Sequence, residues 1–84
     1  MAIAPRERFA QNLVVARRAS GLTQDELANR CKLHRTEISL LERAGREPRL
    51  GTLVKLAGSL GVSVESLAAG VRWDEKAQKF KYRR

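Results

Sequence analysis

The stretch GLTQDELANRCKLHRTEISLLERAGREPRLGTL, residues 21–53, contains two short apolar runs of helical spacing joined by a tight turn. The first run is predicted to form a helix that begins at Gln24, because Thr23 and Glu26 can form a capping box with its first turn. Its apolar stripe consists of Leu27, Ala28 and Cys31. A second helix is predicted over about residues 35–43. Its buried face consists of Ile38 and Leu41.

The opposite face of this second helix is polar, and cationic residues follow it. The outward-facing residues are predicted to be Arg35, Thr36 and Ser39, with Leu40 as a further candidate. Polar side chains at the start of such a helix can reach base edges in the major groove of DNA, and basic side chains behind them can meet phosphates. The two helices therefore indicate a surface that reads double-stranded DNA.

Three further helices are predicted around this pair. The first covers about residues 6–19, and its apolar residues at helical spacing are Phe9, Leu13 and Ala16. After a basic loop over residues 44–49, a fourth helix is predicted to end at Gly61. Its apolar residues are Leu50, Leu53, Val54, Ala57 and Leu60. Ser63 can cap a short fifth helix that extends through Ala69, so residues 1–70 are expected to pack as one all-α domain.

The chain is short and strongly basic. Its 84 residues are expected to form a single core, because a chain of this size buries only about 60–65% of its unfolded surface. Seventeen Lys and Arg residues against nine Asp and Glu give a net charge of +8, half of it in residues 71–84. This excess favours a polyanionic partner, because neutralising phosphates releases counterions. A solvated face that keeps a small protein soluble explains the charge equally well when it is considered alone.

The segment of residues 71–84 alternates apolar or aromatic side chains with cationic ones on both sides of a polar stretch, which predicts a short β-hairpin-like extension. It contains three of the four aromatic residues, Trp73, Phe80 and Tyr82. Three arrangements are open: a hairpin packed on its own domain, a strand pair exchanged with a second protomer, or a cationic arm on DNA. We favour a folded hairpin that buries one face, because a bare linker has no need of aromatic residues.

Other function classes find little support. Cys31 and His34 provide two soft ligands where a structural zinc site needs four, and Cys31 on an apolar stripe is expected to be a small buried hydrophobe. There is no Gly-rich phosphate loop and no spaced carboxylate pair, so we expect no enzymatic activity, metal or cofactor. The sequence has neither a signal peptide nor an apolar stretch of about 20 residues, so a cytoplasmic protein without a membrane partner is expected.

Three motifs at set spacings, GLTQDELA, LHRTEISLLER and EPRLGTLVKLAGSLGVS, give the chain a specific resemblance over about residues 9–70. Together they resemble the Cro/C1-type (Xre family) helix-turn-helix domain of phage repressors and many bacterial regulators. The resemblance implies a five-helix, lambda-repressor-like DNA-binding fold. It also implies a sequence-specific transcriptional regulator that acts as a symmetric homodimer on a palindromic operator of double-stranded DNA.

The resemblance also implies roles for individual residues. The positions that read bases in the family are occupied here by His34, Arg35, Thr36 and Leu40. Glu37 and Ser39 are further candidate contacts, although Glu37 can instead cap the helix that follows His34. Gln24 matches a residue that touches a phosphate and braces the recognition helix. Arg17 and Glu42 match a partly buried ion pair, which we interpret as structural because an unpaired buried charge is strongly destabilising.

The remaining predicted phosphate contacts border the loop before the fourth helix. They are Arg43, Arg46 and Arg49, and the free N–H groups at the start of that helix add a site for a phosphate. Plain solvation of these arginines is the alternative. Arg35 likewise has two interpretations: it donates two hydrogen bonds to a guanine edge, or it contacts only the DNA backbone.

Two positions depart from the family pattern. Lys32 stands where the turn usually carries glycine, and a left-handed lysine is strained, so the turn is expected to open slightly or to follow another path. His34 stands where the cap of the recognition helix is commonly Ser or Thr, and histidine is a poorer cap. Both departures concern the placement of the second helix of the stretch.

The resemblance leaves the partner surface open. Val62, Val64, Leu67 and Val71 are candidates for a contact between protomers, and ordinary core packing is the alternative for each. A rival function is an antitoxin or adaptor protein that binds a protein partner through the fifth helix or the C-terminal extension. The concentration of aromatic residues in that extension is the observation behind this rival.

Overall fold

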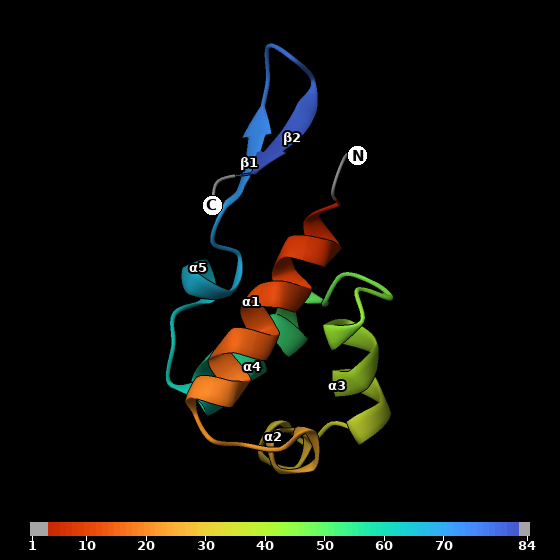
Figure 1. Cartoon of the computed structure of the whole chain (residues 1–84), viewed down its shortest axis with the longest axis vertical. Coiled ribbons are helices and arrows are strands. Elements are labelled where there is room, and N and C mark those ends of the chain that lie inside the picture. Colours follow the sequence, from red (N-terminus) through yellow and green to blue (C-terminus); the bar gives the residue numbers. More distant parts are fainter. Residues whose placement is uncertain (1–3, 83–84) are drawn as a thin grey trace.

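The computed structural model describes residues 4–82, in which five helices precede a two-stranded antiparallel sheet. The helices are α1 (Pro5–Ala19), α2 (Gln24–Cys31), α3 (Arg35–Glu42), α4 (Leu50–Leu60) and α5 (Val64–Leu67), and the strands are β1 (Val71–Asp74) and β2 (Lys79–Tyr82). Figure 1 shows the hairpin at one end of an elongated molecule and α2 at the other, with α3 along one side of the helical body. The predicted helical domain and hairpin extension are therefore both present.

Two of the helices begin where side-chain caps were predicted. The Thr23 hydroxyl accepts a hydrogen bond from the Glu26 backbone N–H at 3.1 Å, and the Thr23 N–H donates to the Glu26 carboxylate at 2.9 Å. The Ser63 hydroxyl accepts from the Ser66 N–H at 3.1 Å and so starts α5. This last helix ends at Leu67, two residues earlier than predicted.

The ends of α1, α2, α3 and α4 share one backbone device, a left-handed residue followed by a hydrogen bond that reaches back five positions. The left-handed residues are Gly21, Lys32, Ala44 and Gly61. At Lys32, with φ 54° and ψ 46°, the Leu33 N–H donates to the Ala28 carbonyl at 2.9 Å, so the turn neither opens nor follows another path. The next residue then turns inward, because Leu33 packs against the core. Lys32 thus adopts the strained conformation that glycine would adopt at lower cost.

The core lies between α1 and the pair α2–α3, with α4 and α5 closing it. Its fully buried large side chains are Leu13, Leu27, Ile38, Leu41, Leu56 and Leu67. Cys31 is also buried and its thiol lies 3.4 Å from the Ser59 hydroxyl, as expected for a small hydrophobe. The expected stripe of α4 is only partly inward, because Leu50 and Val54 are 75% and 53% exposed. Leu67 belongs to this core. Of the four residues predicted as candidates for a contact between protomers, Leu67 is therefore a core residue.

The hairpin is anchored at its base and exposed at its outer end. The Asn12 amide donates to the Leu67 and Ala69 carbonyls, both at 2.9 Å, and the Arg8 guanidinium lies 5.9 Å from the centre of the Tyr82 ring. Trp73 pairs with Phe80 across the strands, yet the two side chains remain 55% and 46% exposed. The prediction that the hairpin buries one face is therefore wrong for this outer pair, because the strands extend beyond the helical body (Figure 1).

Candidate nucleic-acid interface

The two faces of α3 have opposite environments. Ile38 and Leu41 on its inner face are completely buried, whereas Arg35 and Thr36 on its outer face are exposed. The face that was predicted to read DNA therefore points away from the protein. Among residues 4–82, no segment of the hairpin covers it, since the hairpin lies at the other end of the molecule (Figure 1).

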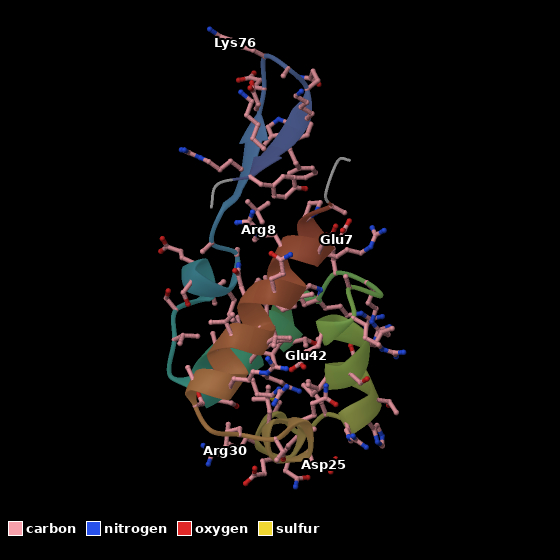
Figure 2. All side chains as sticks on the ribbon, in the orientation of Figure 1. Glu7, Arg8, Asp25, Arg30, Glu42 and Lys76 are labelled. Atoms are coloured by element: carbon pink, nitrogen blue, oxygen red, sulfur yellow. The ribbon has the colours of Figure 1, made fainter. Side chains whose placement is uncertain are left out.

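An ion pair fixes the inner face of α3 to α1. The Arg17 Nε donates to Glu42 Oε2 at 2.6 Å and its Nη2 donates to Oε1 at 3.0 Å, while Nη1 donates to the Leu22 carbonyl. Gln24 adds a hydrogen bond from its Nε2 to Glu42 Oε1 at 3.0 Å. Figure 2 shows Glu42 in the seam between α1 and α3. The α2 residue Gln24 thus braces α3 through this carboxylate.

The same contacts determine the charge state of the pair. Burial tends to raise the pKa of Glu42, but the hydrogen bonds from Arg17 and Gln24 outweigh it, so the pKa lies below the ordinary value of 4.5. The hydrogen bond to Glu42 likewise raises the pKa of Arg17, against the effect of burial. Both side chains are therefore charged at neutral pH.

A second ion pair lies on the outer surface. The Arg35 Nε is 3.5 Å from the Asp25 carboxylate of α2, and the two side chains are 65% and 70% exposed. Exposed pairs of this kind contribute only about 0–1 kcal/mol, so the guanidinium can leave Asp25 for a stronger partner at little cost. Sequence reasoning missed Asp25, because only the packing of α2 against α3 brings it beside Arg35.

The residues around Arg35 differ in how freely they face solvent. His34 is exposed and makes no capping hydrogen bond with its side chain. Glu37 is partly buried, and its carboxylate pairs with Arg46 of the α3–α4 loop. Ser39 is partly buried too, and its carbonyl accepts a hydrogen bond from Arg43 Nε at 3.3 Å.

Leu40 leans toward the α3–α4 loop. A Cβ atom added to Gly45 would lie 2.2 Å from the Leu40 Cδ1, so the Leu40 side chain occupies the space that a larger residue at position 45 would need. Leu40 is also partly buried. Only part of its side chain is therefore available for a contact with a thymine methyl group.

The α3–α4 loop collects basic side chains from several parts of the chain. Arg43, Arg46 and Arg49 are exposed there, and Arg49 precedes α4 without a side-chain cap. Arg6 of α1 joins them, because its Nε donates to the Ala44 carbonyl at 3.1 Å. Sequence reasoning missed Arg6, since its place beside the loop depends on how α1 crosses α3. This edge of α3 is strongly cationic.

Two observations concern other kinds of site. Within residues 4–82 there is no group of three or more His, Cys, Asp or Glu side chains that could hold a metal ion. None of the helices in that part of the chain combines the length and the apolar character needed to cross a membrane.

Comparisons with known proteins agree with this geometry. A family model described as Helix-turn-helix matches residues 15–67. Control protein C.SmaI of Serratia marcescens is 40% identical over 62 residues, which cover 74% of both chains. The crystal structure of the restriction-modification controller protein C.AhdI from Aeromonas hydrophila superposes with a TM-score of 0.74 at 34% identity, covering 77% of this chain and 98% of that one.

A further solved structure, that of the hypothetical transcription factor NHTF from Neisseria, has a TM-score of 0.72 at 36% identity and covers 75% of this chain and 71% of that chain. The matched span includes α2, α3, α4 and α5 in full and the last five residues of α1. The sequence, the fold and these relatives thus lead to one assignment: the chain belongs to the helix-turn-helix family of the Cro/C1 (Xre) type.

Proposed function

We propose that this protein is a transcriptional regulator that binds a specific sequence of double-stranded DNA with α3 in the major groove. One observation carries the proposal: the outer face of α3 presents Arg35 and Thr36 to solvent, while its inner face is locked to α1 and α2. A helix held so firmly keeps its side chains in register with base edges. The names of the relatives, two control or controller proteins and a hypothetical transcription factor, support the same function.

In this proposal Arg35 is the principal reader. Its guanidinium can donate two hydrogen bonds to O6 and N7 of one guanine, which is worth about 1–3 kcal/mol of discrimination. Thr36 can bond a base or touch a thymine methyl group, and His34 lies beside it at the start of the helix. Leu40, Glu37 and Ser39 contribute at the border of the reading face. Leu40 does so only through the part of its side chain that Gly45 leaves uncovered.

Phosphate contacts are assigned to both sides of α3. Gln24 uses one amide hydrogen for Glu42, and its other amide hydrogen is proposed to reach a phosphate. On the loop side the contacts are proposed for Arg43, Arg46 and Arg49, and the first N–H groups of α4 add to them. Such contacts set the position of the protein on the duplex and carry no sequence information of their own.

One copy of α3 reads only one half-site, so we propose that a homodimer binds an inverted repeat. The two recognition helices would then lie about 34–36 Å apart on one side of the duplex. The proposed activity is DNA binding without a catalytic step. The proposed location of this activity is the cytoplasm.

Selection of bound oligonucleotides from a random pool tests this proposal, with the affinity for the enriched sequence followed from low to high salt. We expect an inverted repeat and a logarithmic affinity that falls steeply with the logarithm of salt concentration. Arg35→Ala should remove the preference at one base pair of each half-site. Arg30→Ala, an exposed arginine at the end of α2, is the matched control and should keep it. A pool without any enriched sequence would overturn the proposal in favour of an antitoxin or adaptor.

A further inference from the structure

Among the exposed apolar side chains of residues 4–82, two groups form separate surfaces on the hairpin and on α1. The first, here called the aromatic pair, consists of Trp73 and Phe80 near the outer end of the hairpin, with ring centres 5.1 Å apart in an edge-to-face arrangement. The second, here called the α1 hollow, is an open depression of about 480 Å³ between α1 and the start of the α3–α4 loop. Its apolar lining consists of Ala10, Val14, Val15 and Ala44.

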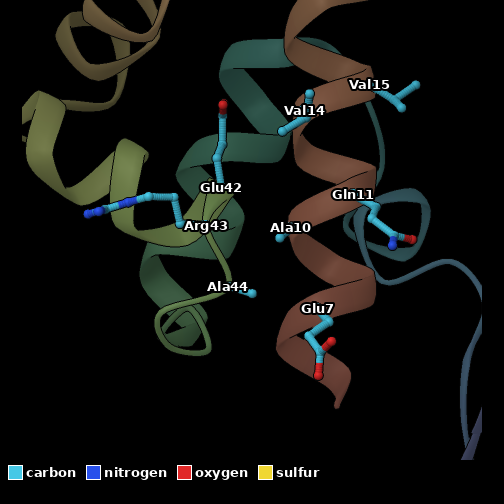
Figure 3. Close-up of a pocket in the computed structure, with 8 residues that line it drawn as sticks. All are labelled: Glu7, Ala10, Gln11, Val14, Val15, Glu42, Arg43 and Ala44. Atoms are coloured by element: carbon cyan, nitrogen blue, oxygen red, sulfur yellow. The ribbon is translucent and has the colours of Figure 1, made fainter. Parts of the chain in front are cut away.

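Figure 3 shows how the α1 hollow is built. Ala10 and Val14 point from α1 toward the loop, while the Arg43 side chain extends away from α1. Val15 is the most exposed large apolar residue of α1, at 68%. Glu7 lies at the end of the hollow nearer the N-terminus of α1. The hollow therefore offers apolar contacts with a carboxylate beside them.

The hairpin is poorly covered by its own domain. A two-stranded hairpin is marginally stable in water unless its apolar face packs on something else. The base of the hairpin contacts α1 through Arg8 and Tyr82. The aromatic pair lies beyond the helical body (Figure 1) and does not cover its own α1 hollow. The apolar face of the hairpin is therefore open to contact with another molecule.

Because successive side chains of a strand point to opposite faces, the charged side chains of the strands lie on the face opposite to the aromatic pair. Arg72 pairs with Lys81, and Asp74 pairs with Lys79, on the face opposite to Trp73 and its partner. Burying the aromatic pair therefore buries none of these charges. The hairpin carries Arg72, Lys79 and Lys81, whereas Glu7 lies at the end of the hollow, so the two surfaces carry charges of opposite sign in addition to their apolar character.

The expected spacing on DNA allows the same two surfaces to meet. The molecule is 41 Å long, with the hairpin at one end and α2 with the start of α3 at the other (Figure 1). Half-sites one helical turn apart need recognition helices about 34–36 Å from each other. Because this spacing is shorter than one molecule, two copies whose hairpins point toward each other along the duplex overlap along their length. In that arrangement the hairpin of each copy lies beside the helical body of the other.

We propose that the aromatic pair of each copy packs into the α1 hollow of a second copy of this chain. The exchange is reciprocal about a two-fold axis, so both apolar surfaces of both copies are covered and the assembly closes at two subunits. This inference rests on the proposed pairing of two protomers on DNA, and it assigns the hairpin to that pairing.

The single tryptophan, Trp73, reports directly on this contact. Its fluorescence emission should shift to longer wavelength when the full chain is diluted, at the concentration where sedimentation shows dimers becoming monomers. Val15→Asp and Phe80→Ala should each raise the dimer dissociation constant at least tenfold. Val54→Asp, an equally conspicuous change at an exposed valine of α4, should leave it within threefold. A dimer that survives the first two variants but is dissociated by Val54→Asp would overturn the proposal.

A cysteine pair provides a second test that does not depend on destabilising anything. Chains carrying Val15→Cys and chains carrying Phe80→Cys should form a disulfide-linked dimer when mixed under mild oxidation, because the buried native Cys31 does not compete. Each variant alone should stay unlinked. Absence of the mixed dimer would overturn the hairpin contact. If the wild-type chain nevertheless binds an inverted repeat as a dimer, the proposed function stands, whereas a chain that enriches no DNA sequence would sink that function separately.

Discussion

The inner and outer faces of α3 each carry an arginine–carboxylate pair, and the two pairs have opposite characters. In the inner pair, Arg17 and Glu42, the side chains are 13% and 6% exposed and two hydrogen bonds join them. In the outer pair, Arg35 and Asp25, the side chains are 65% and 70% exposed and a single 3.5 Å contact joins them. The same chemistry holds the fold together where water is excluded and remains exchangeable where it is not.

The largest effect on stability is expected when the arginine of the inner pair, Arg17, is removed. Arg17→Ala should lower the free energy of unfolding by about 3 kcal/mol, at the lower end of the range for a broken buried pair, because Gln24 continues to donate to Glu42. Thermal unfolding followed by circular dichroism measures the change. The exposed Arg30→Ala is the control and should unfold like the native protein. An unchanged midpoint for Arg17→Ala would mean that the inner pair is as expendable as the outer one.

The inner pair should also show itself through pH. Because the pKa of Glu42 is lowered in the folded state, its stabilisation is complete above about pH 4.5, the ordinary value, and is lost as the pH falls through the folded value. Glu42→Gln should therefore be clearly less stable than the native protein at pH 7, and the gap should narrow on acidification. Urea unfolding between pH 7 and pH 3 measures this gap. A gap that is independent of pH would show that the charge of Glu42 is not what matters.

Removing the arginine of the outer pair should impair DNA discrimination and leave the stability of the fold unchanged. Arg35→Ala should cost about 1–3 kcal/mol of discrimination at one base pair and leave the unfolding midpoint unchanged. Binding to the selected operator and to operators with single substitutions measures the discrimination. Equal weakening on all sequences would instead identify Arg35 as a backbone contact.

The strain in the turn between α2 and α3 can be removed by a substitution that changes neither face of α3. Lys32→Gly should raise the free energy of unfolding by about 0.5–1 kcal/mol, because lysine occupies a left-handed conformation with φ 54°. Lys32→Ala removes the charge but keeps the strain, so it should show no such gain. If both variants gain equally, the cause is the charge and not the backbone.

The smallest effect is expected at the acidic partner of the outer pair. Asp25→Asn should leave the unfolding midpoint unchanged, because the pair is exposed. Binding to operator and to unrelated DNA should both tighten by less than about threefold, since one negative charge near the phosphates is removed. Titrations on both DNAs at a fixed salt concentration test this. A loss of stability comparable with that of Arg17→Ala would remove the distinction between the two faces.

The helices were largely predictable because their signals are local. Thr23 with Glu26, Ser63 and Gly61 mark starts and ends through bonds within a few residues, and the structure uses them as predicted. The exposure of Leu50 and the aromatic pair was not predictable in this way. Helical spacing and strand alternation show which residues share a face, but not whether another element covers that face.

The residues of the candidate site also divide into those that the local sequence pattern predicts and those that only tertiary packing brings together. The outward direction of Arg35 and Thr36 follows from the buried positions of Ile38 and Leu41 on the same short helix. Asp25 and Arg6 join the site through tertiary packing of α2 and α1, and their neighbours along the sequence give no sign of it. Assigning the inner pair required the family resemblance, since nothing local connects residues 25 positions apart.

The contact between Leu40 and Gly45 limits how this protein could be redesigned. Libraries that alter DNA preference can vary positions 35 and 36 freely, because both side chains are open to solvent. Position 40 is coupled to the loop, since any side chain at position 45 would collide with the leucine already there. A designer who wants a new residue at 40 should therefore retain glycine at 45, and one who replaces that glycine should expect the Leu40 side chain to move to another rotamer.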